Sequence, residues 1–324
     1  MQVSVVRPGD LGPVEVSAWR ELQQGQVALS SPFLSPDFAL AVGRARDDAR
    51  VAVVEDAEGF AGFFAFQLGP GATGAPIGDG ICDAQAFVCR AGLEWDPRWL
   101  VRSSGLVAWR FDHLRVEQSA FEPYHRALHS APVMDLSDGL DAFRTAVSTV
   151  SKDVLAQTAR RRRKLAREVG PVVTEWADPA AEPFDALVGW KSAQYAATGT
   201  WDRFEHRWIR TVLDELRAAH CSHCTGLLAT TRAGGRLAAV HFGLAGLHGL
   251  SWWFPAYDPA LGAYSPGLVL LLDLAECAAE RRVATIDLGR GEHGYKRRVA
   301  TGRYLLAEGE VTARRDPAPS GDER

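Results

Sequence analysis

The stretch IDLGRGEHGYKRR, residues 286–298, decides how the fold of this chain is predicted. Its glycines, Gly289, Gly291 and Gly294, have the spacing that holds a dinucleotide pyrophosphate at the start of a helix in nucleotide-binding βαβ units. Such a unit also needs a helix that opens at the last glycine and an acidic residue about 20 positions further on. Here the alternating run at 303–307 predicts a strand instead, and little chain follows it. We therefore interpret the glycines as a flexible turn after a buried strand at 283–287.

The composition limits the class of protein. The chain has 324 residues, of which 47% are hydrophobic, enough for about two domains. Its net charge of −4 creates no global field for nucleic acid or an anionic membrane. Because no segment looks like a signal peptide or a membrane span, we expect a soluble cytoplasmic protein without membrane insertion. The five cysteines do not form a disulfide framework in a chain of this length, which fits a reducing compartment.

Motifs for several other chemistries are absent or incomplete. The run HCSHC at 220–224 holds four potential metal ligands, but structural zinc sites usually draw on two separated pairs, so we predict no metal. The sequence contains no Gly-x-Ser-x-Gly nucleophile elbow and no phosphate-binding P-loop. A serine hydrolase and an ordinary P-loop enzyme are therefore disfavoured.

The pattern along the chain predicts mixed α and β elements with a weak internal repeat. Two hairpins, at 50–68 and 225–245, align strand on strand and turn on turn, which indicates two similar domains. A single further strand is expected at 249–257. The remaining expectations are a strand at 2–6, a helix at 14–24, a helix capped by Ser35-Pro36-Asp37, a glycine-rich loop at 69–84 and a basic helix at 151–170. We predict one domain at 1–148, a second at 149–313 and a disordered tail at 314–324.

The segment YSPGLVLLLDLAECAAERR, residues 264–282, is a better anion site than the three glycines. Ser265 can cap a helix, Pro266 suits its first turn, and Gly267 lets a ligand approach the backbone. A helix N-terminus offers free N–H groups and the positive end of its dipole to a pyrophosphate or carboxylate. The alternative is a well-capped core helix that binds nothing.

Taken together, the segments resemble a known family. The order hairpin, strand, Tyr257-Asp258, Tyr264 to Gly267, long helix, Ile286 to Gly291 and Tyr295-Lys296 is similar to the CelD-type acetyltransferase domain of the GNAT superfamily. Further matches are residues 32–36, the arginine-rich run 160–164 with Leu165, and Trp190-Lys191-x-x-Gln194-Tyr195. The resemblance covers about residues 15–305 and extends to the Fem-type peptidyltransferases of bacterial cell-wall synthesis.

The resemblance implies an α/β (α+β) fold with tandem GNAT-like domains, each a mixed, mostly antiparallel sheet flanked by helices. It implies that the glycine turn carries Tyr295 and Lys296 into the active cleft, where the matching aromatic-lysine pair of Fem-type enzymes lies. An acyl-CoA such as acetyl-CoA would be the co-substrate, with aminoacyl-tRNA as the alternative donor. The acceptor would be an amine or hydroxyl of a small molecule or of an envelope-saccharide precursor.

The candidate site residues fall into three groups. For a chemical role we assign Lys296, Tyr295 and Asp287, because a cationic lysine can stabilise an oxyanion and the aspartate can orient it. The cofactor-binding candidates are Ser265, Pro266, Gly267, Arg290 and Gly291. The substrate-binding candidates are Trp190, Lys191, Gln194, His241, Trp253 and Tyr257. His241 sits in an apolar strand, where a core histidine is the favoured interpretation over a base near neutral pH. Glu292 or His293 are alternative bases on the glycine loop.

The five consecutive positive charges at 160–164 have two interpretations. They surround the helix, so they cannot all face one ligand, but some can grip the phosphates of an acceptor, a CoA or a tRNA. The other interpretation is a solvated face. A third possibility for the whole chain is a binding protein that keeps the fold and has lost the chemistry.

Overall fold

A computed structural model describes residues 1–219, 221–292 and 294–313 of the chain. The tail predicted at 314–324, and residues 220 and 293, therefore lie outside the described residues. The strands are β1 (Gln2–Val6), β2 (Ala49–Asp56), β3 (Gly59–Leu68), β4 (Thr73–Pro76), β5 (Val88–Cys89), β6 (Ala108–Arg115), β7 (His125–Asp135), β8 (Val172–Glu175), β9 (Thr225–Ala233), β10 (Arg236–Ala245), β11 (Gly249–Ser251), β12 (Phe254–Tyr257), β13 (Thr285–Asp287) and β14 (Gly302–Thr312). The α-helices are α1 (Pro13–Gln24), α2 (Pro36–Ala45), α3 (Pro97–Ser103), α4 (Leu140–Val150), α5 (Val154–Glu168), α6 (Glu182–Thr198), α7 (Arg207–Ala218), α8 (Pro266–Glu280) and α9 (Lys296–Val299).

The strands form one continuous mixed sheet. Its order is β1-β2-β3-β4-β6-β14-β7-β13-β11-β10-β9-β8, with β5 on β3 and β12 on β10. Among the described strands, every pairing is antiparallel except β4 with β6 and β11 with β13. This is the mixed, mostly antiparallel α/β fold that the sequence predicts.

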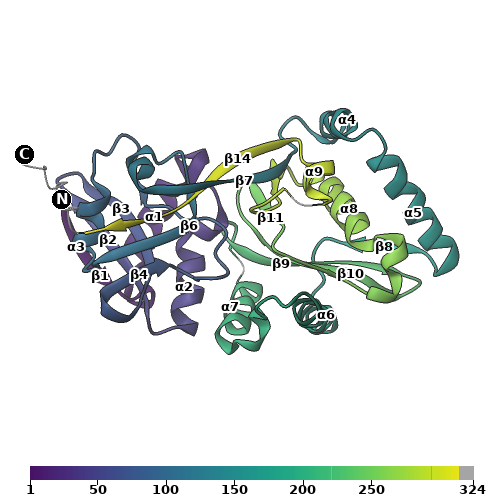
Figure 1. Cartoon of the computed structure of the whole chain (residues 1–324), viewed down its shortest axis with the longest axis horizontal. Coiled ribbons are helices and arrows are strands. Elements are labelled where there is room, and N and C mark those ends of the chain that lie inside the picture. The colour runs from purple at the N-terminus through teal and green to yellow at the C-terminus, as the bar shows by residue number, and fades with distance from the viewer. Residues whose placement is uncertain (220, 293, 314–324) are drawn as a thin grey trace, which may run out of the picture.

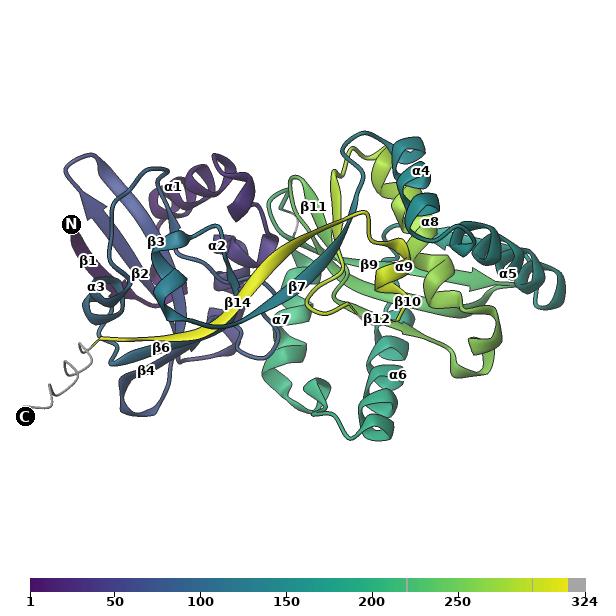
Figure 2. The same cartoon turned by 45° about the horizontal axis from the view of Figure 1, so that its top comes forward.

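Two long strands join the halves of the molecule (Figure 1). β7 and β14 pair from Val133 with Gly302 to His125 with Gly309, and they run side by side from one half to the other (Figure 2). The far part of β14 pairs with β6, while the end of β7 pairs with β13. The last strand of the chain therefore completes the sheet of the first half.

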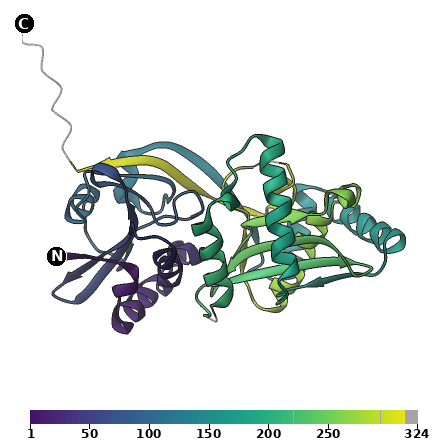
Figure 3. The same cartoon turned by 90° about the horizontal axis from the view of Figure 1, so that it is seen from below.

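The helices cover the second half of the sheet on both faces. Seen from below, α6 and α7 lie across the strands β9 and β10 (Figure 3), while α5 and α8 lie on the opposite face (Figure 1). Buried side chains of α7 and β10, such as Val212 and Phe242, share a hydrophobic cluster with Phe38 of α2 and Phe63 of β3. The two halves are thus joined by a common core as well as by strands. No described helix is long and apolar enough to span a bilayer.

Several local predictions can be compared with the structure. The Ser35 hydroxyl accepts a hydrogen bond from the Phe38 N–H at 3.1 Å, so the predicted cap is confirmed. The two hairpins appear as β2–β3 and β9–β10, and the basic helix is α5. Two expectations were wrong: the loop at 69–84 contains β4, and the strand at 249–257 is divided into β11 and β12. The division at Trp252-Trp253 matters for the site, because β11 pairs with both β10 and β13, whereas β12 pairs with β10 alone among the described strands.

Candidate functional site

The divided strand leaves a free edge in the second half of the sheet. β11 pairs in parallel with β13 from Gly249 with Thr285 to Ser251 with Asp287. β12 pairs only with β10, so no described strand lies on its other edge. Unpaired N–H and C=O groups on such an edge can bind the amides of an extended ligand.

Helix α8 begins close to this edge. A Cβ placed on Gly267 would lie 3.6 Å from the Tyr257 ring at the end of β12. Ser265 does not cap the helix as predicted: its backbone is left-handed, with φ of 49°, and its side chain bonds no helix N–H. Instead the Ser265 hydroxyl accepts a hydrogen bond at 2.9 Å from Arg161 of α5. Pro266 occupies the first turn, as predicted, and the site gains a guanidinium from the basic helix.

The glycine loop after β13, which contains Gly289, Gly291 and Gly294, is fixed by hydrogen bonds from the residues before and after it. Asp287 ends the strand and accepts a hydrogen bond at 2.8 Å from the Gly289 N–H, and Tyr304 of β14 donates its hydroxyl proton to the same carboxylate. Lys296 donates from Nζ to the carbonyl oxygens of Gly289 at 3.3 Å and Arg290 at 3.1 Å. The backbone at Gly289, Gly291 and Gly294 has φ of 72°, 95° and 56°, a region that favours glycine. The interpretation of this segment as a turn therefore explains why glycine occupies these three positions.

Lys296 faces a carboxylate from the other half of the chain. A Cβ placed on Gly289 would stand 3.5 Å from Asp83 Oδ2 and 4.0 Å from Lys296 Nζ. Burial lowers the pKa of Lys296, although the charges of Asp83 and Asp287 oppose this. Burial raises the pKa of both Asp83 and Asp287. Asp83 and Asp287, which come from different halves of the chain, thus both act electrostatically on Lys296.

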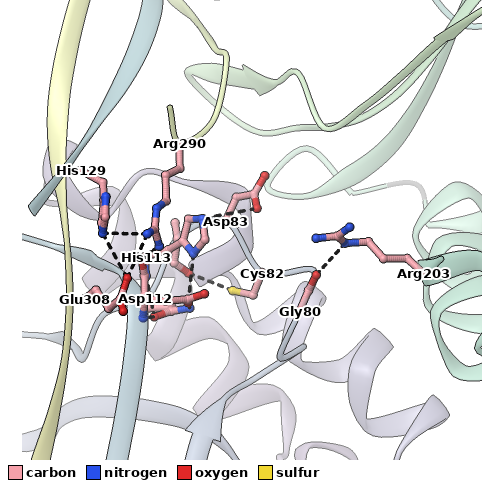
Figure 4. Close-up of polar contacts among 11 residues, drawn as sticks. Gly80, Cys82, Asp83, Asp112, His113, His129, Arg203, Arg290 and Glu308 are labelled. Atoms are coloured by element: carbon pink, nitrogen blue, oxygen red, sulfur yellow. Dashed lines mark hydrogen bonds and ion pairs between the residues drawn. The ribbon is translucent and has the colours of Figure 1, made fainter. Parts of the chain in front are cut away.

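His113 lies beside Asp83, and a second aspartate, Asp112, lies next to the histidine (Figure 4). His113 Nε2 lies 4.0 Å from Asp83 Oδ1, and His113 Nδ1 lies 3.0 Å from Asp112 Oδ1. Burial opposes the charged imidazole, but the hydrogen bond with Asp112 and the charges of both aspartates raise the pKa of His113. Cys82, next to Asp83, is buried, and burial raises the pKa of its thiol, so it stays protonated.

Arg290 joins the glycine loop to the first half. Its Nη1 donates to the Asp112 carbonyl oxygen at 3.0 Å, and its Nη2 lies 2.9 Å from Glu308 Oε2 and 2.7 Å from His129 Nε2. The neighbouring Gly291 N–H donates to the Ser130 carbonyl at 2.8 Å. These two cofactor-binding candidates therefore contact β6, β7 and β14, whereas Ser265, Pro266 and Gly267 lie beside α5 and β12.

The aromatic candidates divide between the site and the core. Tyr295 accepts a hydrogen bond at 2.8 Å from Trp252 Nε1. Trp252 stacks on His241, which is buried, accepts the Trp253 N–H at 3.1 Å and has its pKa lowered by burial to about 3. Trp253 packs against Phe33, with ring centroids 5.0 Å apart. His241 is thus a neutral core histidine, Trp253 a core residue, and Tyr257 an exposed one.

The candidates on α6 lie near one another. Lys191 donates to Gln194 Oε1 at 3.0 Å and lies over the Tyr195 ring, while Trp190 packs against the hydrophobic core. Among the alternative bases, Glu292 lies 3.8 Å from Arg303 and His293 is outside the described residues. Within the described part of the chain, no group of three or more potential ligands could hold a metal ion.

Sequence reasoning missed Asp83, His113 and Asp112. Asp83 follows Cys82 inside what was predicted to be a plain glycine-rich loop, and His113 lies in an ordinary strand. Their only sequence signal is an ionisable side chain among apolar neighbours. The proximity of Asp83 to Lys296 beside Gly289 is created by the tertiary fold.

Comparisons with known proteins agree with this architecture. Residues 154–297 match the family model described as the acetyltransferase (GNAT) domain. The second half of the chain therefore carries a GNAT acetyltransferase domain. A search of curated protein sequences gives no significant match.

Solved structures support the fold of the whole chain. FemX matches with a TM-score of 0.55 and 10% identity, covering 81% of this chain and 87% of that chain. A tandem GNAT protein from the clavulanic acid biosynthesis pathway matches with a TM-score of 0.51 and 13% identity, covering 98% and 100%. A conserved protein of unknown function from Bacteroides thetaiotaomicron matches with a TM-score of 0.55 and 11% identity, covering 92% of this chain and 98% of that chain. At these identities the likeness concerns the fold, which is a tandem GNAT arrangement with Fem-related neighbours.

Proposed function

We propose that the chain transfers an acyl group from acyl-CoA to an amine or hydroxyl of a small molecule or of an envelope-saccharide precursor. The observation that carries the proposal is that Asp83 and Lys296 both lie beside Gly289, next to the strand that ends at Asp287, and interact electrostatically. A proton acceptor and a cation are the two groups that acyl transfer to a nucleophile requires. The match to the GNAT domain supports the same chemistry.

The donor would lie along the free edge of β12, with its phosphates at the start of α8. The edge offers backbone groups to the amides of the CoA chain. The first turn of α8 offers free N–H groups and the positive end of the helix dipole, and Arg161 adds a charge beside Ser265. Gly267 leaves space next to Tyr257 for a close approach.

The chemical step follows from the groups present. The acceptor nitrogen or oxygen attacks the thioester carbon, a C–N or C–O bond forms, and the carbonyl oxygen becomes negative. Asp83 takes the acceptor proton, and the raised pKa of this carboxyl makes it a better base than an exposed aspartate. Lys296 has three N–H donors, of which two bond loop carbonyls, so one is available for the oxyanion. The C–S bond then breaks, and the CoA thiolate receives the proton that Asp83 took from the acceptor, which returns Asp83 to its carboxylate form.

One observation favours a second candidate, aminoacyl-tRNA as the donor. On α5 the side chains of Arg160, Arg163, Lys164 and Arg167 are exposed. Such a basic face can contact the phosphates of a nucleic acid. The third candidate, a non-catalytic binder, would keep ligand binding unchanged when Lys296 is replaced and would show no turnover.

A thermal-shift measurement with acetyl-CoA tests the donor site. Ligand at 100 times Kd stabilises the native state by about 2.7 kcal/mol, which a melting curve resolves. We expect this shift in the wild type and its loss in Gly267→Trp, because the indole fills the space beside Tyr257. Gly9→Trp is the control, since Gly9 is exposed and has no neighbour within 4 Å of a new Cβ. No shift in the wild type at millimolar acetyl-CoA would exclude acyl-CoA as the donor.

A further inference from the structure

Two cations lie close to the ring of one tyrosine near the site. Lys191 Nζ lies 4.7 Å from the centre of the Tyr195 ring, and the Arg203 guanidinium carbon lies 5.6 Å from it. Lys191 and Tyr195 belong to α6, and Arg203 follows in the segment that leads to α7. Both charged side chains are half-buried.

Neither cation forms an ion pair with a carboxylate of the described residues. Among the described residues, no ion pair within 4.0 Å involves Lys191 or Arg203, although most other half-buried arginines have one. Lys191 donates to the neutral Gln194, and Arg203 donates from Nε to the Gly80 carbonyl at 3.0 Å. Burial and the charge of Arg203 together lower the pKa of Lys191 to about 8. Two adjacent like charges that are half removed from water are stabilised by an anion between them.

The position of the pair relates it to the acceptor. Arg203 reaches from the second half to Gly80, three residues before Asp83 (Figure 4). The Trp201 ring lies 2.9 Å from the position of a Cβ on Gly80, so the segment is packed onto the loop that carries Asp83. The charge of Arg203 also acts on Asp83, where it opposes the effect of burial on the carboxyl pKa. A group bound by the pair would thus belong to the molecule whose proton Asp83 accepts.

We propose that Lys191 and Arg203 together bind an anionic oxygen group, a phosphate or a carboxylate, carried by the acceptor. This inference rests on the proposed function, since it takes the Asp83 side as the acceptor side. It narrows the acceptor from any amine or hydroxyl compound to one with a negative group. The donor phosphates, by contrast, are expected at α8.

Selective lysine labelling tests the anion site directly. The chain has four lysines, Lys152, Lys164, Lys191 and Lys296, so mass spectrometry can follow each one after treatment with acetic anhydride. Full-length protein is labelled at pH 8 in sodium chloride, inorganic pyrophosphate or succinate at equal ionic strength. At pH 8, a bound anion that raises the Lys191 pKa from about 8 by one unit lowers the neutral fraction of the lysine, and so its labelling rate, about fivefold. Exposed Lys152 is the internal reference and should label at the same rate in all three salts.

Paired variants show whether the site is the one described. Arg203→Gln should abolish the protection of Lys191, whereas Arg207→Gln, an exposed residue at the start of α7, should preserve it. Protection by pyrophosphate alone assigns a phosphate, protection by succinate alone assigns a carboxylate, and protection by both supports the shared chemistry. Equal labelling in all three salts, or protection that persists in Arg203→Gln, would overturn the inference. The acetyl-CoA thermal shift is independent of these residues, so its loss would instead count against the proposed acyl donor.

Discussion

Lys296 is the residue on which the proposed chemistry depends most. Lys296→Ala removes a donor aimed at the oxyanion, and loss of one such donor typically lowers kcat by 10²–10³, or about 2.7–4 kcal/mol. We expect this loss with little change in the dissociation constant for acetyl-CoA, because the proposed site for the donor phosphates is at α8. Arg297→Ala, an exposed neighbour, is the matched control. A normal kcat in Lys296→Ala would rule out a chemical role for the lysine.

Asp83 gives the reaction a predictable pH dependence. Because burial raises the pKa of this carboxyl, the base form is lost at a higher pH than for an exposed aspartate. The rate should therefore fall on the acidic side with an apparent pKa above the ordinary 3.8. Asp83→Asn should lower kcat and remove this acidic limb, which a pH-rate profile of both proteins measures. An unchanged acidic limb in Asp83→Asn would assign the base to another group.

The glycine loop makes a prediction at the level of the element. Gly289→Ala places a side chain in left-handed backbone, which costs roughly 1–2 kcal/mol, and brings its Cβ near Asp83 and Lys296. We expect a lower free energy of unfolding by about that amount, measured by denaturant titration. Gly189→Ala, at an exposed position of helix α6 with open space around it, should instead raise stability by about 0.5–1 kcal/mol. Equal effects of the two substitutions would contradict the backbone argument.

Elements defined by local signals were predictable from the sequence, and those defined by the partner strand were not. The Ser35-Pro36 cap works as expected because its neighbours are local. Ser265-Pro266 looks the same in sequence, yet Ser265 is left-handed and bonds Arg161 of a distant helix. Likewise, the apolar run at 249–257 suggested one strand, whereas pairing with β13 stops at Ser251. Tertiary contacts decided both cases.

On the scale of the whole molecule, the first half depends on the last strand. β14 carries the buried residues Leu306, Ala307 and Val311 and lies between β6 and β7. A chain that ends at Thr301 would expose the edges of both strands and part of the core, so we expect it to lose the cooperative unfolding transition in calorimetry. A chain that ends at Ala313 keeps every described strand and should melt as the full chain does. Cooperative melting of the chain that ends at Thr301 would show that the halves fold separately.

The part of the site that lies in one stretch of sequence could be predicted, whereas the part that the whole fold assembles could not. Lys296, Tyr295 and Asp287 lie in one short stretch, so a resemblance to a family pointed to them together. Asp83 meets Lys296 only because the sheet brings the loop at 78–85 against the turn after β13, more than half the chain away. The boundary between domains at 148 and 149 stays a prediction. β14 pairs with strands before that boundary.

The place of β14 also orders events during protein synthesis. Leu306 pairs with Arg115, and a ribosome at roughly 5–20 residues per second needs about 10–40 s to make the intervening chain. The strands β6 and β7 therefore leave the exit tunnel long before their shared partner exists. Until β14 has been synthesised, the facing edges of β6 and β7 in the nascent chain stay unpaired or are covered by a chaperone. Any premature stop codon before Gly302 yields a product with a gap in its sheet.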